Sequence, residues 1–222
     1  YWTLFGILSA FGFLSKYLFI YLLASLFIYF VINFKNYKKL IPNYFLSLII
    51  SLMILIPHFL WLAENNFITV FYGLNRSGLT EFSLINHLTN PIIFLAKQIL
   101  ILIPFFLMLI IILKKIKIKF KIKNKNLLFL ISINLIPLSL VLITSIITGA
   151  KIRTMWMTPF YLFLGTLFFY TLKENINLKK IKRFYYTFLF IFFLSPTIYL
   201  IVSLLDETKR TDYPGKEISR LV

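Results

Sequence analysis

The stretch PNYFLSLIISLMILIPHFLWL, residues 42–62, decides the fold of this chain. It opens with Pro42, a residue suited to the first turn of a helix, and it contains no lysine, arginine, aspartate or glutamate. A helix rises 1.5 Å per residue, so about 20 apolar residues cross the ~30 Å hydrocarbon core of a bilayer. The stretch therefore predicts a helix that spans a membrane.

Apolar runs of the same kind lie on both sides of this stretch. They cover residues 18–32, 91–113, 127–147, 155–172 and 184–205. Residues 1–14 are equally apolar but reach only about 21 Å as a helix. Because a backbone in lipid must satisfy its own hydrogen bonds, we expect these runs to be helices. Residues 1–205 are thus predicted to form an all-α, polytopic membrane bundle of about six to seven transmembrane helices.

The overall composition supports this class. The chain is 60% hydrophobic and 19% aromatic, and its mean hydropathy of +0.88 is too high for a soluble domain of 222 residues. It has no cysteine, which excludes disulfides and cysteine-based metal or redox sites. The net charge of +17 would suit a nucleic-acid-binding protein, but here membrane orientation accounts for it, so no nucleic-acid partner is expected.

Lysine and arginine concentrate in three short segments. Residues 35–39, 114–125 and 173–183 hold three, seven and five of the 24 basic residues. These segments alternate with segments poor in lysine and arginine, and the cytoplasmic loops of membrane proteins are rich in both. We therefore predict that the three basic segments are cytoplasmic, and that residues 57–90 and 149–154 lie on the outer side.

Lys16 interrupts the first apolar region. A lysine at the middle of a bilayer costs roughly 2.5–3.5 kcal/mol on insertion scales, so Lys16 indicates a helix end or a water-filled cavity. Alternatively, a single span over residues 12–32 contains Lys16 as a snorkelling side chain. Both interpretations remain open from the sequence.

The two ends of the chain differ in composition. The chain begins inside an apolar run at Tyr1 without an initiator methionine, from which we expect the true N-terminus to lie upstream. Residues 206–222 hold four of the seven acidic residues. We expect this polar tail to be the start of an extracytoplasmic segment.

Residues 57–90, PHFLWLAENNFITVFYGLNRSGLTEFSLINHLTN, differ from the rest of the chain. They contain both histidines, His58 and His87, together with two acidic residues and only one basic residue, Arg76. In a membrane protein this composition predicts an outer loop against the bilayer surface. The two histidines are not spaced as metal ligands, so we favour structural roles for them and predict no metal site.

Cations dominate the predicted outer face, while soluble-enzyme motifs such as a glycine-rich phosphate loop, HExxH and GxSxG are missing. Arginine offers a bidentate fork and lysine a point charge, and both suit a phosphate or pyrophosphate group. We predict that Lys16 and Arg76 bind phosphate, with Lys151 and Trp156 as further candidates. Nearby aromatic residues fit an interfacial belt, or alternatively a groove for a sugar or an isoprenoid chain. They are Trp61, Phe67, Phe71, Tyr72, Trp156 and Tyr161.

Four segments together resemble a family of bacterial membrane glycosyltransferases. They are LSKY (14–17), PHFLW (57–61), FITVFYGLNRSG (67–78) and KIRTMWMTPFYL (151–162). Their order resembles that of the GT-C class, among relatives of the protein O-mannosyltransferases and of the enzyme that adds aminoarabinose to lipid A. In that class a W-x-x-P segment opens a late span, as Trp156 to Pro159 does here. The tail TDYPGKEISRLV (211–222) is similar to the entry into the C-terminal domain of some members.

The resemblance implies a GT-C-like fold in the bacterial inner membrane and a polyprenyl-phosphate sugar as donor, with membrane lipids as the surroundings and no further cofactor. Transfer would take place on the outer side. The family's catalytic residue is an aspartate in the first outer loop, which would precede Tyr1, so residues 1–222 alone are expected to be inactive. The acceptor and the sugar are not implied.

Two other functions remain compatible with the sequence. A transporter or flippase of a lipid or polysaccharide also needs cations that face a lipid phosphate, although no internal repeat supports it. A non-catalytic membrane scaffold would need none of the four candidate residues.

Overall fold

The computed structural model describes residues 1–78, 83–114 and 124–205, and within them the chain is helical. Two compact units emerge, the first made of Tyr1–Leu102 and Lys117–Glu174 and the second of Ile103–Ile116 and Asn175–Val222. The only extended pairing among the described residues is an isolated antiparallel bridge between Leu113 and Ile176, in the second unit. The predicted tail, residues 206–222, lies outside the described residues.

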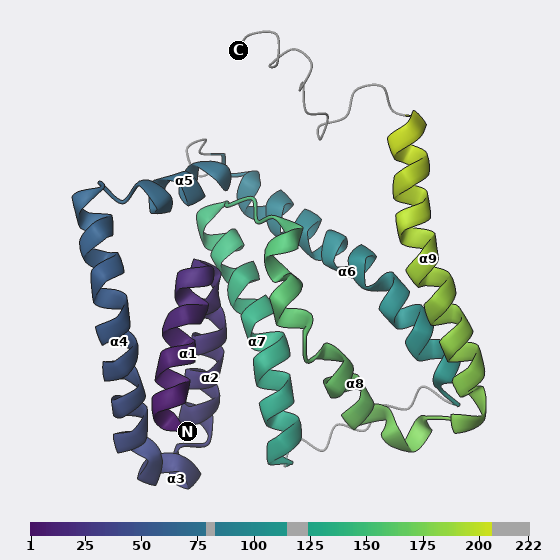
Figure 1. Cartoon of the computed structure of the whole chain (residues 1–222), viewed down its shortest axis with the longest axis horizontal. Coiled ribbons are helices and arrows are strands. Elements are labelled where there is room, and N and C mark those ends of the chain that lie inside the picture. Colours follow the sequence, from purple (N-terminus) through teal and green to yellow (C-terminus); the bar gives the residue numbers. More distant parts are fainter. Residues whose placement is uncertain (79–82, 115–123, 206–222) are drawn as a thin grey trace, which may run out of the picture. The chain divides into compact units, whose positions relative to one another are not determined.

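The first unit contains most of the helices (Figure 1). They are α1 (Trp2–Ser15), α2 (Ile20–Ile32), α3 (Phe34–Tyr37), α4 (Ile41–Glu64), α5 (Ile68–Arg76), α7 (Lys125–Thr148) and α8 (Leu164–Leu172). The long helix α6 (Asn86–Ile112) begins in the first unit and ends in the second, which also holds α9 (Ile181–Leu205).

Several of these helices are long and apolar enough to cross a membrane. The segments 34–64, 86–112, 125–148 and 178–205 meet that requirement, and a bent pair of helices within 154–175 makes a fifth candidate. Helices α1 and α2 are apolar but shorter. Within the described residues, these four to five candidate spans are compatible with an integral membrane protein. The count of six to seven transmembrane helices stays a prediction.

Small residues allow α1 to pack closely against α4. The hydroxyl of Ser47 donates to the carbonyl of Trp2 at 2.7 Å, and that of Ser51 donates to the carbonyl of Gly6 at 2.7 Å. A Cβ atom at Gly6 would lie 2.6 Å from the backbone oxygen of Ser47. The two helices run parallel, because the earlier residue of α1 pairs with the earlier residue of α4 and the later with the later. Close approach through glycine and serine is typical of helix pairs in membranes.

Helix α2 runs antiparallel to α7. The hydroxyl of Tyr21 donates to Thr144 Oγ1 at 2.9 Å, and near the other end the hydroxyl of Tyr29 donates to the carbonyl of Lys125 at 3.5 Å. The turn after α2 and the start of α7 therefore share one end of this unit. A small core of Phe94, Val141, Met157 and Phe160 joins α6, α7 and the segment before α8.

The opposite end of the first unit gathers the segments expected on the outer side. The backbone N–H of Lys151 donates to the carbonyl of Ser77 at 2.8 Å, and Asn90 Nδ2 donates to the carbonyl of Gly149 at 2.7 Å. Ser77 and Asn90 of the stretch 57–90 therefore lie beside residues 149–151. Which side of a membrane this end faces stays a prediction.

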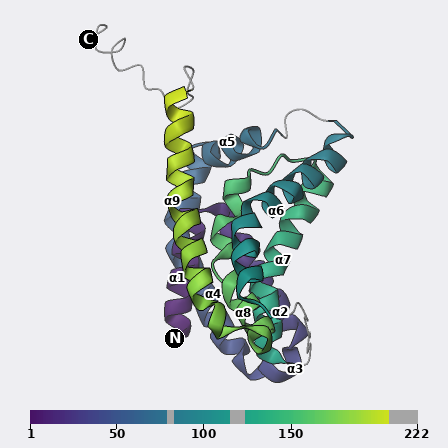
Figure 2. The ribbon, with the colours of Figure 1, turned by 90° about the vertical axis from the view of Figure 1, so that its right-hand side faces the viewer.

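The stretch 57–90 is not a continuous loop. Its first residues remain in α4 up to Glu64, and Asn66 and Phe67 then turn the chain with positive φ angles of 51° and 53°. Helix α5 follows, and Figures 1 and 2 both show it lying across the end of the helices instead of along them. Its exposed side chains Ile68, Phe71 and Tyr72 are apolar or amphipathic, as in a helix that lies in a membrane interface.

Two helix boundaries also differ from those expected. Helix α1 ends before Lys16, so the single span over 12–32 is wrong. Helix α6 begins at Asn86 and not at Pro91, because hydrogen bonds such as Thr89 N–H to the carbonyl of Ile85 (2.9 Å) form one turn earlier.

The apolar run 155–172, predicted to be one of the spans, is bent. A 3-10 helix, η3 (Thr154–Tyr161), meets the following helical segment with a bend of 51°. Pro159 lies inside η3 and has no N–H to donate, which weakens the helical hydrogen bonding just before the bend.

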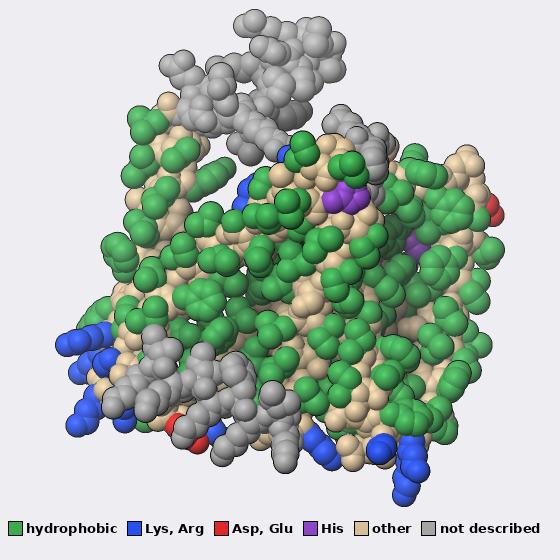
Figure 3. Space-filling view, turned by 180° about the vertical axis from the view of Figure 1, so that it is seen from behind, with side chains coloured by type: hydrophobic (Ala, Val, Ile, Leu, Met, Phe, Trp, Pro, Cys, Tyr) green, Lys and Arg blue, Asp and Glu red, His purple; other side chains and the backbone are tan. Residues whose placement is uncertain are grey.

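The surface of the protein is largely apolar. Figure 3 shows hydrophobic side chains over most of the visible face. None of the most apolar stretch of α9 is buried by other parts of the protein. In water such a surface would be unfavourable, and a bilayer covers it without cost.

Candidate functional site

The Lys16 turn, residues 12–19, is built by a tight reversal between α1 and α2. Lys16 has an extended backbone (φ −162°, ψ 118°) and ends α1, with its N–H bonded to the carbonyl of Gly12 at 3.1 Å. The hydroxyl of Ser15 donates to the same carbonyl at 2.8 Å. Gly12 packs closely against Phe19, since a Cβ atom on Gly12 would lie 2.6 Å from the ring of Phe19. Lys16 thus sits at a helix end, one of the two positions that the sequence allowed.

The side chain of Lys16 reaches a segment 140 residues away in the chain. Its Nζ donates to the carbonyl of Trp156 at 3.2 Å. Burial at this turn lowers the pKa of the Lys16 ammonium from its ordinary value. Two of the four predicted phosphate-binding residues, Lys16 and Trp156, are therefore in direct contact. The ammonium keeps further N–H donors for another acceptor, since it carries three in all.

The other two candidates, Arg76 and Lys151, are joined through the backbone. Ser77, the residue after Arg76, accepts the hydrogen bond from the Lys151 N–H. Both candidate side chains are exposed. The Arg76 guanidinium donates to the hydroxyl of Tyr72 one turn earlier in α5 and lies 5.7 Å from the centre of that ring. Residues 151–156 thus border both pairs. Among the described residues, no hydrogen bond joins the side chain of Arg76 or Lys151 to Lys16.

A polar cluster next to Lys16 was not identified from the sequence. The hydroxyl of Tyr17 lies between His58 Nε2 at 2.9 Å and Thr69 Oγ1 at 2.8 Å, which links the Lys16 turn to α4 and α5. The ring of His58 stacks on Trp61, with centroids 6.1 Å apart and planes inclined by 16°. Tyr17, His58 and Thr69 are far apart in the chain. The only available signal was that they fall in three of the four segments that resemble one family.

The second histidine supports the end of α7. His87 Nδ1 lies 2.8 Å from the carbonyl of Ile146, in the last turn of α7, where helix carbonyls have no partner within the helix. Gly149 ends α7 with a φ of 70°, and its carbonyl accepts from Asn90. The structural role predicted for His87 agrees with these contacts.

Acidic residues are few at this end of the first unit. Glu64 is the last residue of α4 and is exposed, while Glu81 lies outside the described residues. Within the described ranges, no three histidine, cysteine, aspartate or glutamate side chains lie close together. The arrangement therefore offers cations and hydroxyls to an anionic group, beside apolar and aromatic surface.

A buried polar contact fixes η3 beside this site. The hydroxyl of Tyr161 donates to Gln98 Oε1, and Gln98 is only 2% exposed within α6. Buried polar groups in membrane helices are stable when paired in this way. The contact holds η3, and with it the Trp156 carbonyl that Lys16 binds.

No protein-family model, curated protein or solved structure matches this chain.

Proposed function

We propose that this protein is a GT-C membrane glycosyltransferase that transfers a sugar from a polyprenyl-phosphate donor to an acceptor on the outer side of a bacterial inner membrane. The observation that carries the proposal is the contact between Lys16 and the Trp156 carbonyl. It joins the segments LSKY and KIRTMWMTPFYL, which are separated in the chain and which both carry the resemblance. In this proposal α1 and α2 are also membrane helices, and residues 57–90 and 149–154 face the outer side.

The chemistry assigned to these residues is the binding of the leaving phosphate. The acceptor oxygen attacks the anomeric carbon, the bond from that carbon to the phosphate oxygen breaks, and polyprenyl phosphate leaves with the electron pair. Lys16 places a half-buried ammonium where the charge on the phosphate develops, and a dry site strengthens such an interaction. Arg76 and Lys151 add exposed positive charge beside it. The proton of the acceptor passes to a carboxylate, which the resemblance assigns to an aspartate outside residues 1–222.

A bound phosphate would also stabilise the charged form of the Lys16 side chain. Burial disfavours the charged form of this side chain, which lowers its pKa, and the residue has no acidic partner among the described residues. An anionic oxygen next to the ammonium would offset that desolvation. The lipid-facing aromatic residues of α5, Phe71 and Tyr72, provide the adjoining surface for an isoprenoid chain.

The test is transfer of sugar from a polyprenyl-phosphate donor by the complete protein in membranes. Lys16→Gln should lower the transfer rate about 10- to 100-fold, because a charge-assisted contact to phosphate contributes roughly 1.5–3 kcal/mol. Arg76→Ala should lower it by a similar or smaller factor. The matched control is Lys39→Gln, a basic residue of the predicted cytoplasmic segment, which should keep its rate within about twofold. Unchanged transfer by Lys16→Gln, at normal protein levels, would reject the proposal.

A second candidate is a transporter of a lipid-linked anion, and one observation favours it. The 51° bend between η3 and the following helix lies in the segment that contacts Lys16, and transporters use broken helices at their binding sites. Proteoliposomes decide between the two: movement of the lipid-linked sugar across the bilayer without release of polyprenyl phosphate identifies a transporter, and release of polyprenyl phosphate identifies a transferase.

A further inference from the structure

The second unit joins two of the basic segments by hydrogen bonds. Besides the bridge between Leu113 and Ile176, the N–H of Lys114 donates to the carbonyl of Asn175 at 2.8 Å. The N–H of Asn177 donates to the carbonyl of Ile112 at 2.9 Å. The end of α6 is therefore fixed beside the segment that leads into α9, and the start of segment 114–125 lies next to segment 173–183.

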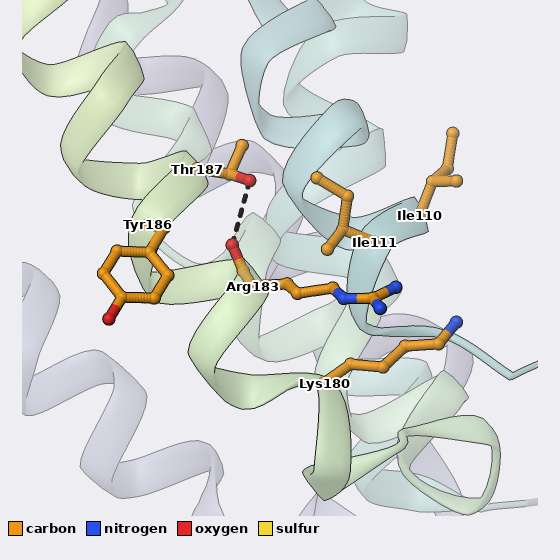
Figure 4. A pocket seen from close by; sticks show the side chains of 6 residues that line it. All are labelled: Ile110, Ile111, Lys180, Arg183, Tyr186 and Thr187. Carbon is orange, nitrogen blue, oxygen red and sulfur yellow. Dashed lines mark hydrogen bonds between the residues drawn. The ribbon is translucent and has the colours of Figure 1, made fainter.

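A pocket opens above this junction. It has a volume of about 480 Å³ and lies between the last turns of α6 and the first turns of α9 (Figure 4). Its lining consists of Ile110, Ile111, Lys180, Arg183, Tyr186 and Thr187. One wall is thus aliphatic, and the other carries two cations and two hydroxyl groups.

The two cations of this pocket are held differently. Lys180 Nζ donates to the carbonyl of Leu113 at 2.7 Å, which satisfies an end carbonyl of α6. Figure 4 shows the side chain of Arg183 extending from α9 toward Ile111, near that of Lys180. Among the described residues, the Arg183 guanidinium has neither a hydrogen-bond nor an ion-pair partner, and the side chain is exposed. Its five N–H donors are available to an anion.

The start of α9 is rich in basic residues. Its first turn holds no acidic residue, whereas Lys182 and Arg183 lie there and Lys180 directly precedes it. The N-terminus of a helix carries a partial positive charge, so cations at this position repel it and an anion is stabilised there. Residues 115–123 add five lysines and no acid to the sequence that follows α6.

We propose that this pocket, which includes part of the basic segment 173–183 that is predicted to be cytoplasmic, binds the phosphate group of an anionic phospholipid. The phosphate would lie between Arg183 and Lys180, and the acyl chains would follow the exposed aliphatic surface of α6 at Ile110. Basic pockets between membrane helices on the cytoplasmic side recognise phospholipid headgroups through this combination of cation and apolar wall. A soluble phosphate would use the cations but not the aliphatic wall. The proposal does not depend on transferase activity.

Lipid binding to the full chain in neutral detergent tests the proposal. The probes are phosphatidylglycerol, phosphatidylcholine and inorganic phosphate, and the readout is the amount bound per protein, measured by native mass spectrometry. We expect one tightly retained phosphatidylglycerol, little phosphatidylcholine, and no displacement by inorganic phosphate. Arg183→Gln should weaken phosphatidylglycerol retention by about 10-fold or more, because it removes a charge-assisted contact.

The matched control is Lys179→Gln, which removes one charge from the same segment at a residue that does not line the pocket. It should change retention by less than about twofold if the pocket is the site. Equal weakening by the two variants, or equal retention of the two lipids by the wild type, would overturn the proposal and leave only diffuse attraction to the surface charge. Displacement by inorganic phosphate would overturn the assignment to a lipid. Arg183→Lys keeps the charge and should show an intermediate loss.

Discussion

Lys16 in the first unit and Arg183 in the second are both cations beside helix ends, but their surroundings differ. Lys16 is half-buried and already donates to the Trp156 carbonyl, and its turn is fixed by tight packing at Gly12. Arg183 is exposed and lines an open pocket, and its guanidinium has no hydrogen-bond or ion-pair partner among the described residues. The first cation therefore belongs to the tertiary structure as well as to any ligand site. The second is available to a ligand without any protein contact being broken.

The difference has consequences for binding. A ligand at Lys16 gains from a partly desolvated charge, and it is placed by a rigid turn, which favours selective recognition and catalysis. A ligand at Arg183 meets a solvated charge, whose interactions are weakened by salt. It must gain the rest of its affinity from apolar contact, as a lipid does.

The largest expected effect concerns sidedness, since residues 57–90 and segment 173–183 are predicted to face opposite sides of a membrane. The chain has no native cysteine, so a single cysteine can be introduced at Asn65 or at Lys179. A membrane-impermeant thiol reagent added to intact cells then labels only a cysteine that is accessible from outside. We expect labelling at position 65 and none at 179, because the basic segments are predicted to be cytoplasmic. The reverse pattern would move the proposed transferase site to the cytoplasm, and labelling of both would invalidate the predicted topology.

The next effect concerns the packing of α1, the helix that leads into the Lys16 turn, against α4. Gly6→Ala places a methyl group 2.6 Å from the Ser47 backbone oxygen, so it should lower the free energy of unfolding by about 1–3 kcal/mol. Gly73→Ala in α5 meets nothing within 4 Å and should raise it by up to about 1 kcal/mol. Thermal or denaturant unfolding in detergent measures both. A similar response of the two variants would mean that α1 does not pack on α4 as described.

A smaller effect concerns the hydroxyl beside Lys16. Tyr17→Phe removes the hydrogen bonds to His58 and Thr69, and should cost about 1–2 kcal/mol of unfolding free energy. Tyr199→Phe is the control: this residue is 66% exposed in α9, and the change should stay within about 0.5 kcal/mol. If the two substitutions had equal effects, the Tyr17 hydroxyl would not link the helices.

The smallest effect concerns the difference between Arg183 and Lys180 within the second unit. In neutral detergent Arg183→Met should change the unfolding free energy by no more than about 0.5 kcal/mol, because the guanidinium has no partner to lose among the described residues. Lys180→Met loses the hydrogen bond to the Leu113 carbonyl and should cost about 1 kcal/mol. The same unfolding measurement compares them, and a larger loss for Arg183→Met would show that this side chain is already held by the protein.

Much of the helix pattern could be predicted from the sequence. Pro42 begins α4 within one residue of its observed start, and the runs at 127–147 and 184–205 correspond to α7 and α9. The break at Lys16 was one of two predicted possibilities. These features are local, because twenty consecutive apolar residues, or one charge among them, decide whether a segment can be a helix in lipid.

The sequence by itself thus determined the class of the protein, its long helices and the grouping of its basic segments. Only the tertiary structure decided that Lys16 contacts Trp156, that Tyr17 links His58 to Thr69, and that Arg183 lines a pocket with α6. The same is true of the 51° angle of the bend after η3, although Pro159 marks a weak point of the helix in the sequence. Hydropathy depends on each residue alone, whereas helix pairs in a membrane are selected by close packing and hydrogen bonds between distant residues. No periodic signal in one sequence records those pairs.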